Sequence, residues 1–210
     1  MKKNLTELVF IIDRSGSMFG YEKDTIGGFN STVEKQREGE GEVLVSTVLF
    51  SGRSRVLHDR VNISKIEPMT ERDYHAEGNT ALLDAVGDAI HHISNIHKYA
   101  REEDIPEKTI FVITTDGMEN ASRRYGYRRI KAMIQEKTER FGWEFVFLGA
   151  NINAAETAEH IGIRRDRSAN YSHTGAGVRD SYRIMSCAIS DIRRVGDAVL
   201  SDYEEEENNK

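Results

Sequence analysis

The 210-residue sequence has one cysteine, two prolines and no long apolar run, and these scarcities exclude several classes of protein. The single cysteine, Cys187, rules out a disulfide within the chain and favours a reducing compartment. No segment approaches the roughly 18–20 consecutive apolar residues that a helix needs to span a bilayer. A formal net charge of −6 gives no electrostatic case for nucleic acid as the main partner.

The N-terminus has some features of a signal peptide, because Lys2 and Lys3 precede an apolar run. That run is short, Glu7 interrupts the approach to it, and no small-residue cleavage site follows. We therefore expect a cytoplasmic protein. The length suits one sizeable core and is short for two full domains. We expect one domain over residues 1–200 and an acidic, disordered tail over 201–210.

A continuous apolar run at 8–12 ends at Asp13, and Ser15 and Ser17 follow at alternating positions. Such a run is typical of a strand that is buried on both faces of a parallel sheet. The strand would deliver one carboxylate and two hydroxyls to its C-terminal tip, and hard divalent cations favour oxygen ligands of this kind. The alternative is a local turn in which these side chains only cap neighbouring backbone groups.

Two later stretches have a related pattern. Thr80 follows Gly78 and Asn79 at the start of a long amphipathic segment, whose apolar residues have helical spacing. A second apolar run, at 110–113, leads to Asp116, which glycine follows. Ligands of open α/β sheets bind outside the carboxyl ends of the strands. Both aspartates are therefore expected at the edge of the sheet where ligands bind.

With these residues identified, the sequence resembles the von Willebrand factor type A family, in its bacterial or intracellular single-domain form. The metal-ion-dependent adhesion site of that family consists of an Asp-x-Ser-x-Ser stretch, a distant Thr and a more distant Asp. The residues that match this pattern are Asp13, Ser15, Ser17, Thr80 and Asp116. The resemblance implies that the two strands are central neighbours and that the metal lies in the crevice between them. It also implies that the hydroxyls contact the metal directly, while the aspartates often act through water.

The alternation of strands and helices predicts a doubly wound, Rossmann-like α/β fold with helices on both faces of the sheet. We expect about six strands, mostly parallel. The link at 51–54 is too short for a parallel crossover, so the strand after it should be an antiparallel edge strand. The expected strands lie at 8–13, 42–50, 55–58, 107–116, 143–148 and 169–172. The expected helices lie at 24–37, 80–102, 128–141, 154–161 and from 175 onward.

The charge of the proposed ligands suggests a function. Two carboxylates neutralise a divalent cation, and three hydroxyls add coordination without adding charge. One position should then remain open to an anionic oxygen, and in the family an Asp or Glu of a partner protein fills it. We expect a non-catalytic adaptor that binds Mg2+, with Mn2+ or Ca2+ as alternatives. The resemblance implies multiprotein assemblies, sometimes with AAA+ ATPases.

Two other functions are consistent with the sequence. One is a Mg2+-dependent hydrolase or phosphoryl-transfer enzyme that uses the same crevice, which would need a base beside the metal. No histidine or lysine base is evident near the loops, although His75 is close to Thr80 in sequence, and the chain has no phosphate-binding loop motif. The other is an interaction domain in which the metal is purely structural.

Several residues beside the motifs have open roles. Arg123 and Arg124 would attract an acidic partner or would simply be solvated, and Glu119 and Asn120 are candidates for outer support of the metal site. The set Met18, Phe19 and Tyr21 would form an apolar rim around the site, or a staple that seats the first helix.

Overall fold

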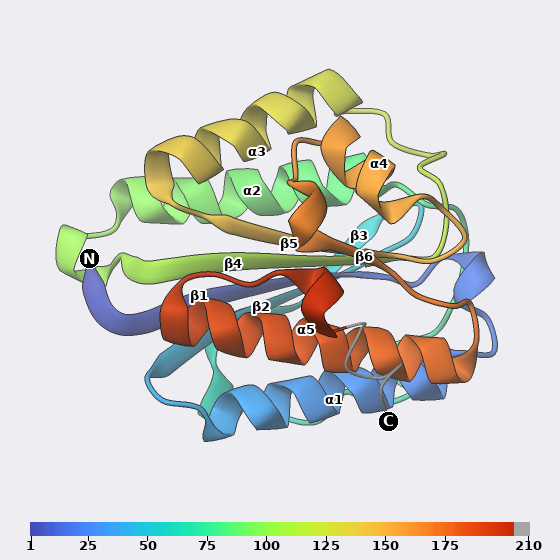
Figure 1. Ribbon diagram of the computed structural model, residues 1–210, viewed down its shortest axis with the longest axis horizontal. Coiled ribbons are helices and arrows are strands. Elements are labelled where there is room, and N and C mark those ends of the chain that lie inside the picture. Colours follow the sequence, from blue (N-terminus) through green and yellow to red (C-terminus); the bar gives the residue numbers. More distant parts are fainter. Residues whose placement is uncertain (204–210) are drawn as a thin grey trace.

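The computed structural model describes residues 1–203, which form a six-stranded sheet between two layers of helices (Figure 1). The strands lie in the order β3-β2-β1-β4-β5-β6 across the sheet. All neighbouring pairs are parallel except β2 and β3, which are antiparallel at one edge. The strands are β1 (Lys2–Asp13), β2 (Glu42–Phe50), β3 (Ser54–Asn62), β4 (Pro106–Thr115), β5 (Glu144–Gly149) and β6 (Ser168–Asn170). The predicted α/β fold and its antiparallel edge strand are confirmed.

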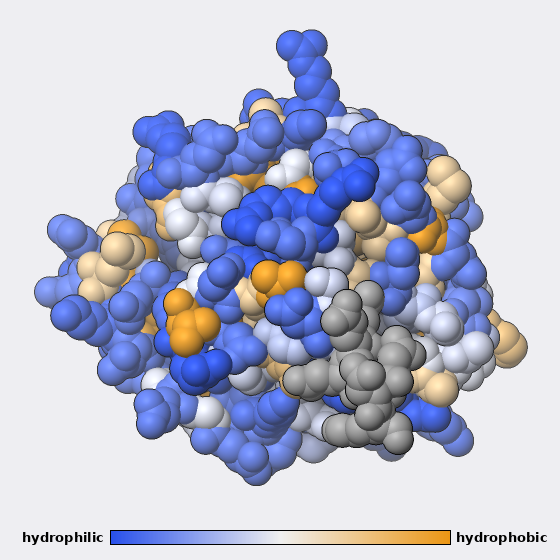
Figure 2. Space-filling view, viewed as in Figure 1, coloured by the Kyte–Doolittle hydropathy of each residue, from blue (hydrophilic) through white to orange (hydrophobic). Residues whose placement is uncertain are grey.

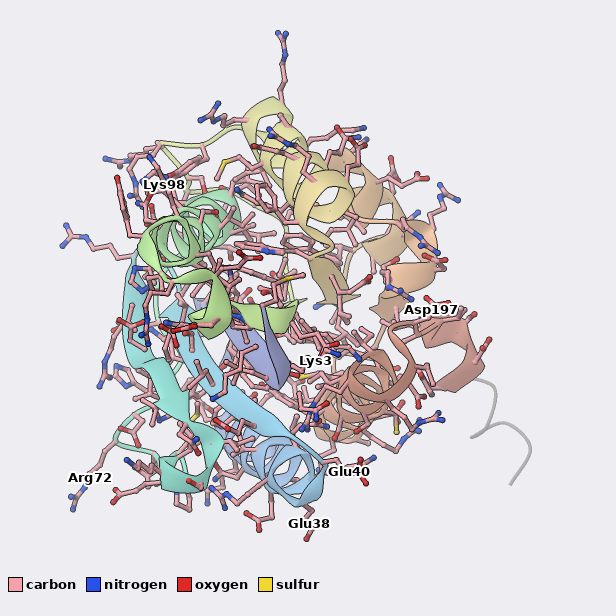
Figure 3. The ribbon with its side chains drawn as sticks, turned by 90° about the vertical axis from the view of Figure 1, so that its left-hand side faces the viewer. Lys3, Glu38, Glu40, Arg72, Lys98 and Asp197 are labelled. Atoms are coloured by element: carbon pink, nitrogen blue, oxygen red, sulfur yellow. The ribbon has the colours of Figure 1, made fainter. Side chains whose placement is uncertain are left out.

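Helices cover both faces of the sheet, as the end-on view in Figure 3 shows. One layer contains α2, α3 and α4, and the other contains α1 and α5. The helices are α1 (Glu22–Glu38), α2 (Leu82–Tyr99), α3 (Tyr127–Phe141), α4 (Ala154–His160) and α5 (Gly175–Val195). Short 3-10 turns lie at η1 (Gly16–Met18), η2 (Ile63–Lys65), η3 (Glu102–Asp104) and η4 (Arg165–Arg167).

Two apolar cores explain the unbroken hydrophobic run in β1. Leu8, Phe10 and Ile12 pack into the core beneath α1 and α5, whereas Val9 and Ile11 pack into the core beneath α2 and α3. Successive side chains of a strand point to opposite faces, so a strand that is covered on both sides has no polar face. All five of these side chains are almost fully buried.

The central position of β1 and β4 brings two aspartates to the same edge of the sheet. These two strands are parallel neighbours, with Ile12 paired to Thr114, so that Asp13 and Asp116 end up at the same edge of the sheet. The strand that follows β1 in sequence, β2, lies on one side of this pair of strands, and the strand that follows β4, β5, lies on the other side. A crevice at such a reversal of strand order is where open α/β sheets bind their ligands.

The boundaries of several elements differ from the predicted ones. The strand β1 begins at Lys2, which pairs with β4 and whose N–H donates to the Ile105 carbonyl. The register then shifts between Lys2 and Thr6, where Asn4 has a φ of 58°. The helix α1 begins at Glu22, before the expected cap Asp24, whose carboxylate instead pairs with Arg179 of α5. The helix α2 is shorter at both ends than the predicted 80–102, because it begins at Leu82 and ends at Tyr99; Ala100 and Arg101 are not helical, and Glu102 begins the separate turn η3.

The described chain continues past α5. Leu200 is fully buried, and the Tyr203 hydroxyl donates a hydrogen bond to Asp191 at 2.6 Å. The remainder of the predicted tail, 204–210, lies outside the described residues. Within residues 1–203, no helix is both long and apolar enough to cross a membrane. The face shown in Figure 2 is mainly hydrophilic, and its apolar residues are in small separate groups.

Candidate metal centre

Asp13 lies at the tip of β1 and is 1% exposed. Its Oδ1 accepts a hydrogen bond from the Ser15 backbone N–H at 2.7 Å, and its Oδ2 accepts one from the Thr115 hydroxyl at 2.7 Å. The Tyr74 hydroxyl donates to the Asp13 carbonyl at 2.6 Å. The local turn considered as an alternative is therefore present, but it holds only one carboxylate oxygen. The other oxygen is bound by the neighbouring strand.

The two serines of the loop after β1 face the carboxylate that follows β4. The Ser17 hydroxyl donates to Asp116 Oδ1 at 2.6 Å, and the Ser15 hydroxyl lies 3.4 Å from the same oxygen. The two hydroxyl oxygens are 3.2 Å apart. Residues that are about a hundred positions apart in the chain therefore converge on one carboxylate, which itself is 1% exposed.

Thr80 completes the predicted set from a third segment. The Gly16 N–H donates to the Gly78 carbonyl at 2.9 Å, which holds the loop at 78–81 against the loop that follows β1. A Cβ atom at Gly117 would lie 3.9 Å from the Ser17 hydroxyl oxygen and 4.0 Å from that of Thr80. Both hydroxyls therefore face the space over Gly117. Thr80 is 4% exposed, and its hydroxyl has no hydrogen-bond partner among residues 1–203.

Asn120 and Glu119, in the loop after β4, hold the backbone of Thr80 and of the first turn of α2 in place. Asn120 Oδ1 accepts from the Thr80 N–H at 2.9 Å, while the Asn120 N–H donates to the Thr80 carbonyl at 3.0 Å. The Glu119 carboxylate accepts from the N–H groups of Leu83 and Ser122, at 2.9 and 2.7 Å, and so fixes the first turn of α2. Glu119 and Asn120 therefore support the segment that carries Thr80, and their role around a metal stays a prediction.

The charge at this site is not balanced by lysine or arginine. Among the described residues, neither Asp13 nor Asp116 forms an ion pair with a lysine or arginine. Burial raises the pKa of Asp13 from 3.8 to about 6; hydrogen bonds from Ser15 and Thr115 oppose this rise, and the charge of Asp116 adds to it. A buried carboxylate pair of this kind favours a cation that would neutralise it.

The oxygen donors fit a hard divalent cation. Two carboxylates and the hydroxyls of Ser15, Ser17 and Thr80 face one crevice, and such donors suit Mg2+, Mn2+ and Ca2+. Within residues 1–203, no group of three or more His, Cys, Asp or Glu side chains is placed to hold a metal. A metal at this crevice would therefore depend on the hydroxyl ligands, as the sequence motif predicts.

His173 is a site residue that the sequence reasoning missed. Its Nε2 lies 3.0 Å from Asp116 Oδ2 and 3.2 Å from the Ser17 carbonyl oxygen. Its ring contacts the edge of Tyr21, at 4.6 Å between centroids, and its own carbonyl accepts from the Tyr21 hydroxyl at 3.0 Å. His173 stands alone in a polar loop between β6 and α5, and only the topology places that loop at the carboxyl edge of the sheet.

The apolar residues after the metal loop have separate roles. Met18 is buried and Tyr21 is half-buried against the core, which agrees with a packing role. Phe19 is 79% exposed beside the crevice, and Met118, which the sequence reasoning did not consider, is 74% exposed on the loop after Asp116. The exposed rim therefore consists of Phe19 and Met118.

The two adjacent arginines also differ. Arg124 forms a bidentate ion pair with Asp88, and its Nε lies 3.6 Å from Asp84. The Arg123 side chain has no ion-pair or hydrogen-bond partner among residues 1–203. Arg124 therefore has a structural role in holding the loop onto α2, whereas the guanidinium of Arg123 is exposed beside the site.

By sequence, the chain matches no protein-family model and no curated protein. By structure, it is similar to the vWF domain of the type V pili tip protein Mfa5 from Porphyromonas gingivalis, with a TM-score of 0.61 at 12% identity, over 88% of this chain and 94% of that one. It is also similar to a von Willebrand factor type A structure from Catenulispora acidiphila, with a TM-score of 0.57 at 14% identity, over 88% of this chain and 42% of that one.

A third similar structure is proximal thread matrix protein 1 from the mussel byssus with a zinc-occupied MIDAS motif. Its TM-score is 0.56 at 14% identity, over 86% of this chain and 46% of that one. The chain therefore spans slightly less than half the length of two of these three structures. These likenesses concern the arrangement of the helices and strands. The protein has the fold of von Willebrand factor type A domains.

Proposed function

We propose that this protein is a non-catalytic, divalent-metal-dependent binding module that captures an acidic side chain of a partner protein. Its metal site would be an intact metal-ion-dependent adhesion site formed by Asp13, Ser15, Ser17, Thr80 and Asp116. The observation that carries the proposal is that the Ser15 and Ser17 hydroxyls converge on Asp116 while the Thr80 hydroxyl lies near the adjacent Gly117.

The similar structures support this proposal at the level of the fold. The mussel protein has zinc at its MIDAS motif, and the bacterial domain from Mfa5 belongs to a pilus tip protein. Mg2+ is our preferred metal here, because all of the candidate donors are hard oxygen atoms. Zinc, by contrast, is bound mainly by Cys, His and carboxylate ligands in proteins.

The residues of the site would have different roles in binding the metal and the partner. Asp13 and Asp116 supply two negative charges, and their fixed hydrogen bonds with Ser15, Ser17 and Thr115 hold the carboxylates in place. The Thr80 hydroxyl, which has no partner within residues 1–203, adds a neutral donor. A bound divalent cation would supply an electrophilic position for the partner's carboxylate. Phe19 and Met118 would then exclude water around that contact.

The test is a pull-down from the native cell extract with the wild type in Mg2+, the wild type in EDTA, and Thr80→Ala in Mg2+. We expect a partner that only the wild type captures in Mg2+. The backbone groups of Thr80 make the contacts with Asn120, so the variant should keep its fold. The same experiment shows whether an AAA+ ATPase is among the captured proteins, as the resemblance predicts.

Two outcomes would contradict the proposal. Capture that is unchanged by EDTA and by Thr80→Ala would leave the metal in a purely structural role. Mg2+-dependent turnover of phosphate esters that is lost in Asp13→Ala would establish the hydrolase alternative. His173 is the observation that favours this alternative, since an imidazole lies beside Asp116. Its Nε2 is, however, already engaged by Asp116 and by the Ser17 carbonyl.

A further inference from the structure

A basic cleft lies beside the candidate metal centre. Arg53, in the loop between β2 and β3, and Arg123, in the loop between β4 and α3, line two adjoining clefts of about 250 and 400 Å³. Asn79, the residue before Thr80, lines the smaller of the two. The cleft is therefore next to the segment that brings Thr80 to the metal centre. We name it the Arg53–Arg123 cleft.

Two of the three arginines that line the larger cleft, Arg53 and Arg123, differ from the third, Arg124. Within the described part of the chain, neither side chain has an ion-pair or hydrogen-bond partner, and both residues are exposed. The arginines around them are engaged: Arg14 pairs with Glu77, Arg55 donates to the Asp73 carbonyl, and Arg124 pairs with Asp88. The protein as a whole has a net charge of −6, so two unpaired cations at one cleft are a local feature.

The backbone that carries these two side chains is held in place. The Ala81 N–H donates to the Ser51 carbonyl at 2.8 Å, which ties the loop of Arg53 to the segment of Thr80. The Arg123 N–H donates to Asp84 at 3.0 Å. Both guanidinium groups are thus presented from fixed points on the same side of the metal centre.

Asp84 also lines the cleft, but its carboxylate is already satisfied. It accepts hydrogen bonds from three consecutive backbone N–H groups, those of Arg123, Arg124 and Tyr125, at 2.9–3.0 Å. These neutral donors occupy both carboxylate oxygens but leave the negative charge of Asp84 in place, and Asp88, which also lines the larger cleft, pairs with Arg124. The lining of that cleft has three arginines and two aspartates, so it carries a net charge of +1. The cleft therefore remains a site for an external anion.

We infer that the Arg53–Arg123 cleft binds a second carboxylate from the same partner segment whose first carboxylate is captured at the metal centre. The inference rests on the proposed function. The partner is then an acidic segment with two Asp or Glu side chains a few residues apart, one for each position. Two linked contacts raise affinity more than either contact alone, because the second carboxylate is held close to its site once the first is bound.

The probe is a series of capped peptides, Ac-Gly-Glu-(Gly)n-Glu-Gly-NH2 with n between 0 and 5, and the single-site peptide Ac-Gly-Glu-Gly-NH2. Binding to the whole protein in Mg2+ is followed by NMR titration. For at least one value of n, we expect the peptide with two glutamates to bind about tenfold more tightly than the single-site peptide. The second glutamate would pair with Arg53 and Arg123, and each exposed ion pair contributes up to about fivefold in affinity. In Arg53→Gln/Arg123→Gln, the gain should fall to about twofold, the statistical advantage of having two glutamates that can reach the metal centre.

The matched control is Arg140→Gln, in the last turn of α3 and at the opposite end of that helix from Arg123. It removes a charge from an exposed arginine and should keep the full gain. The inference is overturned if no spacing gives a gain above about twofold, or if such a gain survives in the double variant. A peptide with phosphoserine in place of the second glutamate is titrated in the same way, and a gain that only this peptide shows also overturns the inference.

The same titration separates the two proposals. Metal-dependent binding of the single-site peptide without any gain from a second glutamate removes the inference and leaves the proposed function intact. If the single-site peptide does not bind in Mg2+ and EDTA leaves the binding of the other peptides unchanged, both the proposed function and the inference are contradicted.

Discussion

Two buried carboxylates on the same strand have opposite surroundings. Glu7 is fully buried in the middle of β1, and its two oxygens lie 3.1 and 2.8 Å from the Arg60 Nε, with His97 at 3.4 Å. Asp13 is equally buried at the tip of β1, but its neighbour in charge is Asp116, another carboxylate.

The comparison shows where the protein supplies its own cation and where it does not. A buried charge is tolerated when it is paired and hydrogen-bonded. At Glu7, the chain provides the pairing group from β3, so the carboxylate serves the fold. At Asp13, only neutral donors surround the carboxylate among the described residues, and this arrangement favours a cation from solution. Four predictions test this difference.

The largest effect is expected for Glu7→Gln. The substitution removes the partner of Arg60, whose side chain is 23% exposed, and leaves a poorly solvated positive charge. Loss of one member of a buried pair costs about 3–5 kcal/mol, so we expect a loss near the lower end of that range, measured by urea denaturation. The control Glu42→Gln breaks an exposed pair with Lys2 and should change stability by less than about 0.5 kcal/mol. A loss below about 1 kcal/mol for Glu7→Gln would show that the pair is not structural.

The second prediction concerns pH in the absence of metal. Because the pKa of Asp13 is raised from 3.8 to about 6, the folded protein binds more protons than the unfolded chain between these values. The contribution of Asp13 to the free energy of unfolding is thus favourable at low pH and is lost as pH rises through about 6. The loss is roughly 3 kcal/mol.

Denaturation of the wild type and of Asp13→Asn in EDTA, from pH 4.5 to 7.5, isolates this contribution. The variant should become the more stable protein as pH rises, and Mg2+ should stabilise the wild type alone. Stability curves that run parallel across this pH range would contradict the prediction.

A smaller effect is expected for Ser17→Ala. The substitution removes a candidate metal ligand and the hydrogen bond to Asp116, so the affinity for Mg2+ should fall about tenfold or more. Ser17 is exposed, and the free energy of unfolding in EDTA should therefore change by less than about 0.5 kcal/mol. Isothermal titration calorimetry with Mg2+ measures the affinity. Ser17→Thr keeps the hydroxyl and should bind Mg2+ nearly as the wild type does; equal affinity in all three proteins would remove Ser17 from the ligand set.

The smallest effect is expected for the exposed rim. Phe19→Ser and Met118→Ser alter side chains that make little contact with the core, so stability and Mg2+ affinity should stay within experimental error. Binding of the captured partner should weaken about fivefold in each, as for side chains that exclude water around a central contact. Tyr99→Ser, at the far end of α2, changes an equally exposed aromatic residue and should have no effect. Unchanged partner affinity in both rim variants would place the interface elsewhere.

The fold and the strand tips were predictable from sequence for a physical reason. A strand that is buried on both faces must be apolar throughout, so the first polar residue, such as Asp13, marks the edge of the sheet. The antiparallel pairing of β3 followed from the length of its link to β2. The early part of β1 was missed because the polar residues Lys3 and Asn4 do not have the pattern of a buried strand.

Other parts of the site were beyond sequence reasoning. Arg123 and Arg124 are identical and adjacent, yet only the path of the backbone decides that Arg124 reaches Asp88. His173 and Tyr74 are single polar residues without a periodic pattern; His173 lies in the short loop between β6 and α5, and Tyr74 lies in the long connection between η2 and α2. The metal ligands themselves stay a prediction, which the calorimetric titrations test.

The long separations between contacting residues have a consequence for synthesis of the chain. Ser17 and Asp116 are 99 residues apart, and Asp116 is a further 57 residues from His173. While a ribosome is still translating the segment before Asp116, the nascent polypeptide carries the loop at 13–17 but has nothing to close it. A nascent chain therefore cannot bring the candidate ligands together until Asp116 has been synthesised and has left the ribosome.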